Sequence, residues 1–234
     1  MAEEKAFDKT PLNTVGRLPA RGSYDKDVIK SIIEEAKVGH VAWVDDEGLP
    51  QCIPMLGAVE DIDGDLFIYF HGYQAARFVK SLSEQGTRMA ATFTLIDGYV
   101  LALSHFHHSM NYRSAVLHGF SLPFGSFAHE KGKETELKAE KFKLVVEAAV
   151  PGRWEHARTP DDTEIASTGL IRMQVETGSA KRREGGPKDE KKDLEDPALK
   201  HIWTGVVPVT RTAGAPEPMD FVNFAPPEHV LNLQ

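Results

Sequence analysis

The sequence lacks the features that mark exported or membrane-anchored proteins. Its only cysteine, Cys52, cannot form a disulfide within the chain. No apolar run is long enough to cross a bilayer, and residues 1–5 lack the basic-then-apolar pattern of a signal peptide. These absences predict a cytoplasmic protein that does not act on a membrane. Cys52 lies in an apolar segment, which favours a small buried side chain over a nucleophile.

Most signatures of catalysis are also missing. The sequence contains no glycine-rich nucleotide-binding loop, no Gly-x-Ser-x-Gly motif and no obvious pair of carboxylates. Lys and Arg number 27 against 35 Asp and Glu, which gives a net charge of −8. Nucleic-acid binding relies on neutralising phosphates, so this balance argues against it. A local positive pocket for a single phosphate remains compatible with the balance.

The 234 residues, of which 41% are hydrophobic, are enough to bury a sizeable core. Residues 1–22 contain scattered proline and glycine and are expected to form an extended arm, either mobile or laid across a partner. We predict a single domain over residues 23–210, followed by a proline-rich tail over residues 211–234. Within the domain, residues 179–200 are expected to form a solvated loop, which the alternating charges of residues 188–193 support. The alternative for residues 181–187 is a phosphate clamp or lid.

The periodicity of apolar residues predicts a mainly β, barrel-like α+β domain. The predicted strands cover residues 40–44, 49–59, 65–70, 87–96, 99–106, 111–122, 164–176 and 201–209. The predicted helices cover residues 25–36, with Asp25 as N-cap and Gly39 as terminator, 74–83 and 134–149.

Two local signals refine the predicted strands. Asp97 and Gly98 lie between apolar runs and predict a hairpin turn. Pro50 and Pro54 cannot both lie in a strand that is paired on both sides. One edge of that strand must therefore be free or bulged, which leaves backbone groups available to a ligand.

Two stretches carry more polar side chains than a structural strand needs. In the first, Arg77 and Lys80 follow a strand end and begin a helix, where a phosphate is favoured. The alternative is two solvated cations on an amphipathic helix. The second stretch holds Ser109, Asn111, Arg113 and Ser114 and is typical of a site for a polar, planar ligand. Its alternative is a turn in which Ser109 and Asn111 cap backbone groups.

The residues next to the second stretch leave further alternatives open. His105, His107 and His108 would need another ligand to hold a metal, and none can be named, so no metal is predicted. Histidines that bond to neighbours or to a ligand are favoured instead. Trp203 either packs in the core or stacks against an aromatic cofactor.

Together these stretches resemble the pyridoxamine 5′-phosphate oxidase-like superfamily of FMN-binding split barrels. The resemblance is greatest to its branch of flavin-nucleotide-binding proteins, which includes nitroimidazole-resistance-type proteins. The segments that carry it cover residues 17–25, 48–55, 63–65, 69–72, 107–114, 151–154, 180–187 and 203–208.

The resemblance implies a six-stranded antiparallel split β-barrel with flanking helices that forms a homodimer, with FMN at the subunit interface. It implies that Ile53, Pro54 and Met55 lie along the isoalloxazine ring. His71, Gly72 and the following helix start, with Arg77, would hold the ribityl chain and phosphate. The residues that would complete the site are Lys80, Ser109, Asn111, Arg113, Ser114 and Trp203.

The sequence also departs from the family. Oxidases proper carry Ser-Arg-Lys at the phosphate, where this chain has Ala75, Ala76 and Arg77, and their C-terminal substrate motif is not found. Vitamin B6 oxidation is therefore not expected. The function predicted is an FMN-dependent oxidoreductase that acts on a small aromatic or nitro compound, with no side chain named as catalytic. The alternatives are a flavin or haem carrier, with the histidine cluster as axial ligand, and a dimeric scaffold with a decayed pocket.

Overall fold

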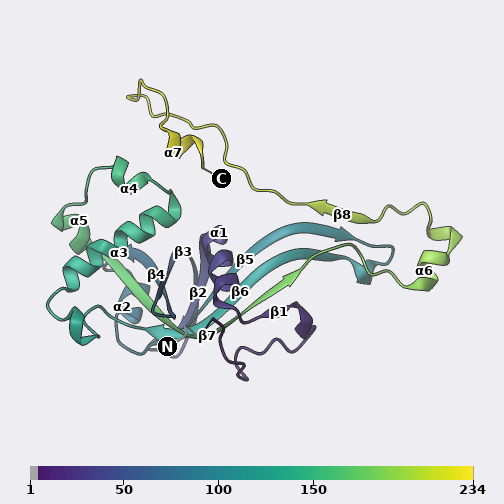
Figure 1. The fold of residues 1–234 in the computed structure, drawn as a ribbon, viewed down its shortest axis with the longest axis horizontal. Coiled ribbons are helices and arrows are strands. Elements are labelled where there is room, and N and C mark those ends of the chain that lie inside the picture. Colours follow the sequence, from purple (N-terminus) through teal and green to yellow (C-terminus); the bar gives the residue numbers. More distant parts are fainter. Residues whose placement is uncertain (1–4, 234) are drawn as a thin grey trace.

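The computed structural model describes residues 5–233 and shows a closed antiparallel barrel (Figure 1). Its six strands are β2 (Val38–Val44), β3 (Pro50–Ile62), β4 (Asp65–Tyr73), β5 (Arg88–Leu101), β6 (Ser109–Ser121) and β7 (Thr168–Arg183). They neighbour one another in the order β7-β4-β3-β2-β5-β6, and β6 pairs with β7 to close the circuit. The predicted six-stranded antiparallel barrel is confirmed. Two short strands, β1 (Gly22–Ser23) and β8 (Gly205–Pro208), add to β7 and β5.

Helix α1 (Lys26–Ala36) packs into the barrel core. The side chain of Asp25 accepts hydrogen bonds from the N–H groups of Asp27 and Val28, as the predicted N-cap. The helix ends at Lys37, which has a φ of 61°, two residues before the predicted Gly39. Gly39 is needed for another reason: a Cβ there would clash with the ring of Phe93 at the centre of the barrel.

A helical cap covers the outer face of β3 and β4 (Figure 1). It consists of α3 (Glu134–Ala149), α4 (Arg153–His156) and α5 (Asp162–Ser167). Val145 of α3 is buried in a second apolar cluster with Phe67 and Tyr69 of β4. Beside this cluster the buried side chain of Arg172 forms an ion pair with the buried side chain of Glu130. The cap is therefore a second packed layer on the barrel.

The predicted hairpin at Asp97 and Gly98 is wrong. The strand β5 runs through these residues and pairs with β6 on both sides of them, with a register shift between Ile96 and Gly98. The Asp97 carboxylate instead receives two hydrogen bonds from Arg113 of β6. Asp and Gly favour both β-bulges and tight turns. The dipeptide therefore marked an irregular position in the strand, but the chain does not reverse there. Beyond the barrel, β5 and β6 continue as a curved ribbon (Figure 1).

The structure also corrects the predicted loop over residues 179–200. Residues 179–183 belong to β7, and the side chain of Arg183 is buried. The helix α6 (Lys191–Glu195) then forms at the far end of the ribbon (Figure 1). The predicted strand over residues 164–176 begins later, because residues 162–167 form α5. The many charged residues from 179 onward predicted a solvated loop, whereas residues 179–183 extend β7 and pair with β6.

The chain ends pack onto the barrel and its cap. In the described part of the arm, Ala6 bridges Asp25, and the Asn13 amide bonds to Thr177 and Gly178 of β7 in the same chain. Residues 1–4 of the predicted arm and residue 234 of the tail lie outside the described residues. The tail carries α7 (Glu228–Leu231). Across residues 5–233, no helix combines the length and apolar character needed to cross a membrane.

Candidate functional site

The split in the barrel lies between β3 and β4. These strands pair from Gly57 and Phe70 to Ile62 and Asp65, but not beyond. Residues 50–56 of β3 keep β2 as their only partner, so their other edge is free. The two prolines predicted this free edge, and the prediction is confirmed. Residues 71–73 of β4 are likewise unpaired on the side that faces the split, since β4 pairs there only with β7.

The side chains of β3 alternate along this free edge. Met55 is buried, and Ile53 packs against the barrel core. Pro54 and Cys52 are exposed on the opposite face. The prediction of a buried Cys52 is therefore wrong, because alternation in a strand sends residues 52 and 54 outward when 53 and 55 point inward. The predicted ring-binding residues thus form one continuous strip of accessible backbone.

The end of β4 positions a short helix beside the split. A Cβ at Gly72 would clash with the Phe78 ring, so the missing side chain lets α2 (Arg77–Leu82) pack directly on the strand end. His71 is exposed, and partial desolvation lowers the pKa of its imidazole. The neutral form of His71 therefore persists to lower pH than that of a free histidine.

Arg77 forms an ion pair with the turn between β2 and β3. Its guanidinium pairs with the carboxylate of Asp45, which is buried. The same carboxylate accepts hydrogen bonds from the N–H groups of Glu47 at 3.0 Å and Leu49 at 2.9 Å, and from the Gln51 amide at 2.8 Å. Asp45 thereby shapes the turn and links it to α2 across the split.

The hollow around Arg77 carries more negative than positive groups. It measures about 430 Å³ and is lined by Asp45, Asp46, Glu47, Ala75, Arg77, Lys80, Ser81 and Glu84. Four carboxylates thus face two cations. Lys80 is exposed and forms no ion pair within residues 5–233. Three lining residues can donate hydrogen bonds from their side chains to a phosphate, namely Arg77, Lys80 and Ser81. Ala75 has no hydroxyl to add.

The second predicted group is largely engaged within the chain. The Arg113 guanidinium bonds Asp97 in β5 and Glu35 in α1. The hydrogen bonds to Glu35, and then those to Asp97, raise the pKa of Arg113, and the hydrogen bonds from Arg113 lower the pKa of Glu35. Asn111 is buried and accepts a hydrogen bond from Arg183. The Ser114 hydroxyl donates a long bond of 3.4 Å to the Lys181 carbonyl.

Arg183 is a buried cation of the run over residues 181–187, which was expected to be solvated and so gave no sign of a buried charge. Its guanidinium also bonds the carbonyls of Gly185 at 3.1 Å and Gly186 at 3.0 Å. Burial, and then the nearby charge of Arg21, lower its pKa. The buried position of Arg183 follows only once β7 is known to continue through residues 181–183, because alternation in a strand then turns one of these three cations inward.

The histidine cluster forms a 3₁₀ turn at the start of β6. The Nδ1 atom of His108 accepts a hydrogen bond from the Ala102 N–H at 3.3 Å. His107 lies 4.0 Å from Asp189 and 3.9 Å from Glu190. Its Nδ1 atom is buried and has no hydrogen-bond partner within residues 5–233. In that same range no three side chains of His, Cys, Asp or Glu gather closely enough to hold a metal.

Trp203 belongs to the far end of the ribbon, between α6 and β8. Its side chain is 63% exposed and covers Gly205, where an added Cβ would lie 2.9 Å from the indole ring. Ser109 pairs with Val100 on the same ribbon, beyond the part of β5 that pairs with β2. Within one chain, Ser109 and Trp203 are therefore on a different part of the fold from β3 and α2 (Figure 1).

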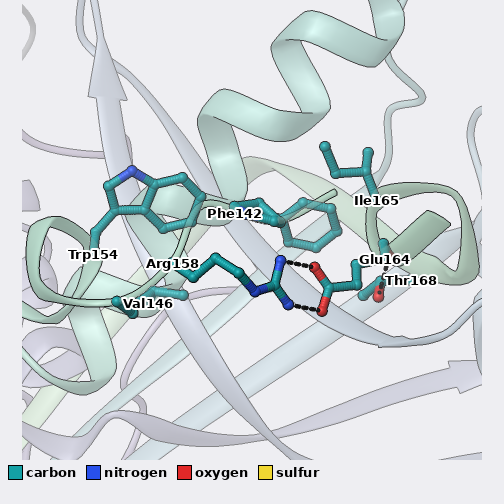
Figure 2. A pocket seen from close by; sticks show the side chains of 9 residues that line it. Phe142, Val146, Trp154, Arg158, Glu164, Ile165 and Thr168 are labelled. Carbon is teal, nitrogen blue, oxygen red and sulfur yellow. Dashed lines mark hydrogen bonds and ion pairs between the residues drawn. The ribbon is translucent and has the colours of Figure 1, made fainter. Parts of the chain in front are cut away.

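A separate, more apolar pocket lies within the helical cap (Figure 2). It measures about 280 Å³ and is lined mainly by Phe142, Val146, Trp154 and Ile165. Arg158 and Glu164 close one side with paired bonds of 3.0 and 2.7 Å. None of the residues predicted for the site lines this pocket, so it is not an extension of the split.

Comparison with known proteins gives the family. The sequence model of the pyridoxamine 5′-phosphate oxidase family matches residues 25–182, more than half of the chain. The chain belongs to this family. No curated protein matches the sequence.

Two solved structures resemble nearly the whole chain, and a third resembles about two thirds of it. The flavocytochrome Anf3 from Azotobacter vinelandii superposes with a TM-score of 0.80 at 29% identity, over 96% of this chain and 97% of that one. The FAD and heme binding protein from Mycobacterium smegmatis gives 0.76 at 26% identity, over 91% and 97%. A proposed 5-nitroimidazole antibiotic resistance protein from Bacteroides thetaiotaomicron gives 0.53 at 21% identity, over 68% and 85%, and shows the shared fold.

Proposed function

We propose that this protein is a homodimeric flavoprotein that uses FMN in a redox reaction of a small aromatic or nitro compound. The observation that carries the proposal is the free edge of β3 over residues 50–56, open beside α2 and Arg77. Unpaired backbone groups next to the apolar Ile53 and Met55 match the ring of a flavin, which has polar edges and apolar faces. The flavin names of the two relatives that cover the whole chain support the same reading.

A second copy of the chain is part of the proposal. The ribbon and its surroundings expose several large apolar side chains, namely Ile96, Tyr99, Phe106, Met110, Trp203 and Val207. An exposed apolar surface of this extent favours contact with another chain. Such a contact would bring Ser109 and Trp203 of one copy toward the β3 edge of the other. The site would then be complete only in the dimer.

The flavin supplies the electron transfer, and the chain supplies position and environment. Backbone groups of Ile53, Pro54 and Met55 would hold the ring edge. His71 and Gly72 would lie along the ribityl chain. Arg77 and Lys80 would contact the phosphate, although Arg77 must share its charge with Asp45. The acidic hollow predicts weak retention of the phosphate, so FMN is expected to dissociate during purification.

Haem binding is the second candidate, since both full-length relatives are named for haem as well as flavin. Two histidines of this chain offer a buried nitrogen without a partner in the described residues, the Nδ1 atom of His107 and the Nε2 atom of His229. The ring of His229 in the tail is tilted by 57° against the ring of His156 in the cap, with 4.8 Å between the ring centroids. An unpartnered buried imidazole nitrogen is the donor that an iron ligand requires.

One absorbance experiment tests both candidates. Purified protein is dialysed to equilibrium against FMN, FAD or haemin, and the chromophore that it retains in excess of the dialysate is scanned, while light scattering measures its mass. A retained flavin spectrum in a dimer supports the first candidate. A Soret band that is lost in His107→Ala or His229→Ala, but kept in the exposed-site control His201→Ala, supports the second. A protein that retains neither chromophore overturns both and leaves the scaffold alternative.

A further inference from the structure

A second cavity lies apart from the split, between the arm, α1 and the adjoining parts of β6 and β7. It measures about 400 Å³. Its lining combines cations, hydroxyls and apolar side chains: Arg21, Ser23, Val28, Ser31, Ile32, Arg113, Lys181 and Arg182. Among residues 5–233, no carboxylate lines it. In a chain whose net charge is −8, a cavity with four cations is a local reversal of the overall charge.

The strand register forces these cations together. Arg113 of β6 lies directly opposite Arg182 of β7, and Ser114 lies opposite Lys181. Like charges opposite each other on neighbouring strands destabilise a sheet unless something offsets them. Glu35 and Asp97 neutralise the charge of Arg113, but not that of the other three cations. Within residues 5–233, Arg21, Lys181 and Arg182 form no ion pair.

Arg183, the residue that follows Arg182 in β7, adds positive charge next to the cavity. It is buried, and within residues 5–233 its hydrogen bonds go only to the neutral oxygens of Asn111, Gly185 and Gly186. Arg21 is close enough to disfavour its charge further. A buried guanidinium without a carboxylate partner costs stability. The cluster is therefore best satisfied by an anion from outside the chain.

We propose that this cavity binds the phosphate group of a small molecule, with Arg21, Lys181 and Arg182 as its ligands. Guanidinium groups recognise phosphate oxygens in pairs, and the hydroxyls of Ser23 and Ser31 add donors. The apolar side chains of Val28 and Ile32 form a wall for the organic part of the molecule. The site does not depend on flavin binding at the split. Since Arg77 and Lys80 are proposed for the single phosphate of FMN, the phosphate bound here belongs to a separate phosphorylated electron donor or substrate.

Calorimetric titration with inorganic pyrophosphate tests the site in the full chain without added flavin. Wild-type protein should bind pyrophosphate, and Arg182→Gln and Arg21→Gln should each weaken binding at least tenfold. Arg182→Lys should retain most of the affinity. The matched control is Arg153→Gln, which removes an exposed arginine of α4 that does not line the cavity. Thermal melts would show that each variant is folded.

The outcomes are distinct. Absence of pyrophosphate binding, or an equal affinity in Arg182→Gln, Arg21→Gln and Arg153→Gln, overturns the proposal. If FMN displaces pyrophosphate and riboflavin does not, the cavity is part of the flavin site and the proposal of a separate ligand is overturned. If FMN leaves pyrophosphate bound, the cavity serves a separate phosphorylated molecule. This last result supports the site and can be obtained even if the flavin proposal fails.

Discussion

Arg77 at the start of α2 pairs with the buried carboxylate of Asp45 across the split of the barrel. The pair joins the turn between β2 and β3 to the helix that follows β4. A phosphate at this position would compete with the Asp45 carboxylate for the guanidinium of Arg77. The strength of phosphate binding should therefore reflect how far Arg77 can serve both partners.

Replacing Arg77 by alanine should separate phosphate recognition from ring recognition. We expect Arg77→Ala to weaken FMN binding about tenfold, which corresponds to about 1.4 kcal/mol. This is just below the range of about 1.5–3 kcal/mol for a hydrogen bond to a charged group, because Arg77 shares its charge with Asp45. Riboflavin, which has no phosphate, should bind the variant as it binds the wild type. Fluorescence titration of both flavins measures the difference.

The control for this comparison is Arg158→Ala. Arg158 is 67% exposed at its side chain and pairs with Glu164, much as Arg77 is 61% exposed and pairs with Asp45. Since Arg158 lies in the cap, its loss should leave both flavins unaffected. Equal weakening of FMN and riboflavin by Arg77→Ala would mean that Arg77 only maintains the shape of the split.

Gly72→Ala should displace α2. A Cβ at this position would clash with the Phe78 ring, and overpacking of this kind costs about 1–3 kcal/mol. We expect a lower urea midpoint together with weaker FMN binding, because α2 carries Arg77. Gly16→Ala is the matched control, since a Cβ there meets nothing within 4 Å and its φ is not positive. A Gly72 variant as stable as the Gly16 variant would contradict the packing described here.

The sequence predicted the barrel and the free edge of β3 because both follow from local rules. Apolar alternation marks each strand, and Pro50 and Pro54 exclude pairing on both sides. The sequence could not reveal that Asp97 forms a bulge instead of a turn, since that outcome depends on Arg113 and Glu35, which are distant in the chain. The family resemblance gave the right architecture where local signals were ambiguous.

The candidate site was predicted less well than the fold. Residue type indicated Arg77 and Arg113, but their partners Asp45 and Glu35 come from other elements, and only the tertiary structure brings them together. The same holds for the cavity at Arg182, because residues 179–183 read as a solvated run until their pairing with β6 is known. Charge in a sequence gives no sign of which cations share a face.

The buried pair of Glu130 and Arg172 should make stability fall in acid. Burial raises the pKa of Glu130, but the hydrogen bond and charge of Arg172 outweigh it and lower the pKa overall. A depressed carboxylate pKa contributes stability that is present above about pH 4.3, the ordinary pKa, and is lost as the pH falls through the lower folded value. Urea midpoints from pH 7 to pH 3 should show this loss.

Glu130→Gln should be less stable at pH 7 by about 3–5 kcal/mol, since it leaves the Arg172 charge buried and unpaired. It should also lose less stability than the wild type between pH 5 and pH 3. The control is Glu164→Gln, whose exposed pair with Arg158 should matter much less at any pH. Parallel pH profiles for Glu130→Gln and the wild type would exclude the pair as the acid-sensitive element.

Cys52 reports on the flavin at the β3 edge without any substitution. It is the only cysteine of the chain and is exposed one residue before Ile53. A flavin along residues 53–55 would shield the thiol from a bulky alkylating reagent, so saturating FMN should slow alkylation several-fold. Dimer formation alone would shield Cys52 to the same degree with and without FMN. Rates measured by mass spectrometry at constant protein concentration therefore distinguish the two, and equal rates would move the flavin away from this strand.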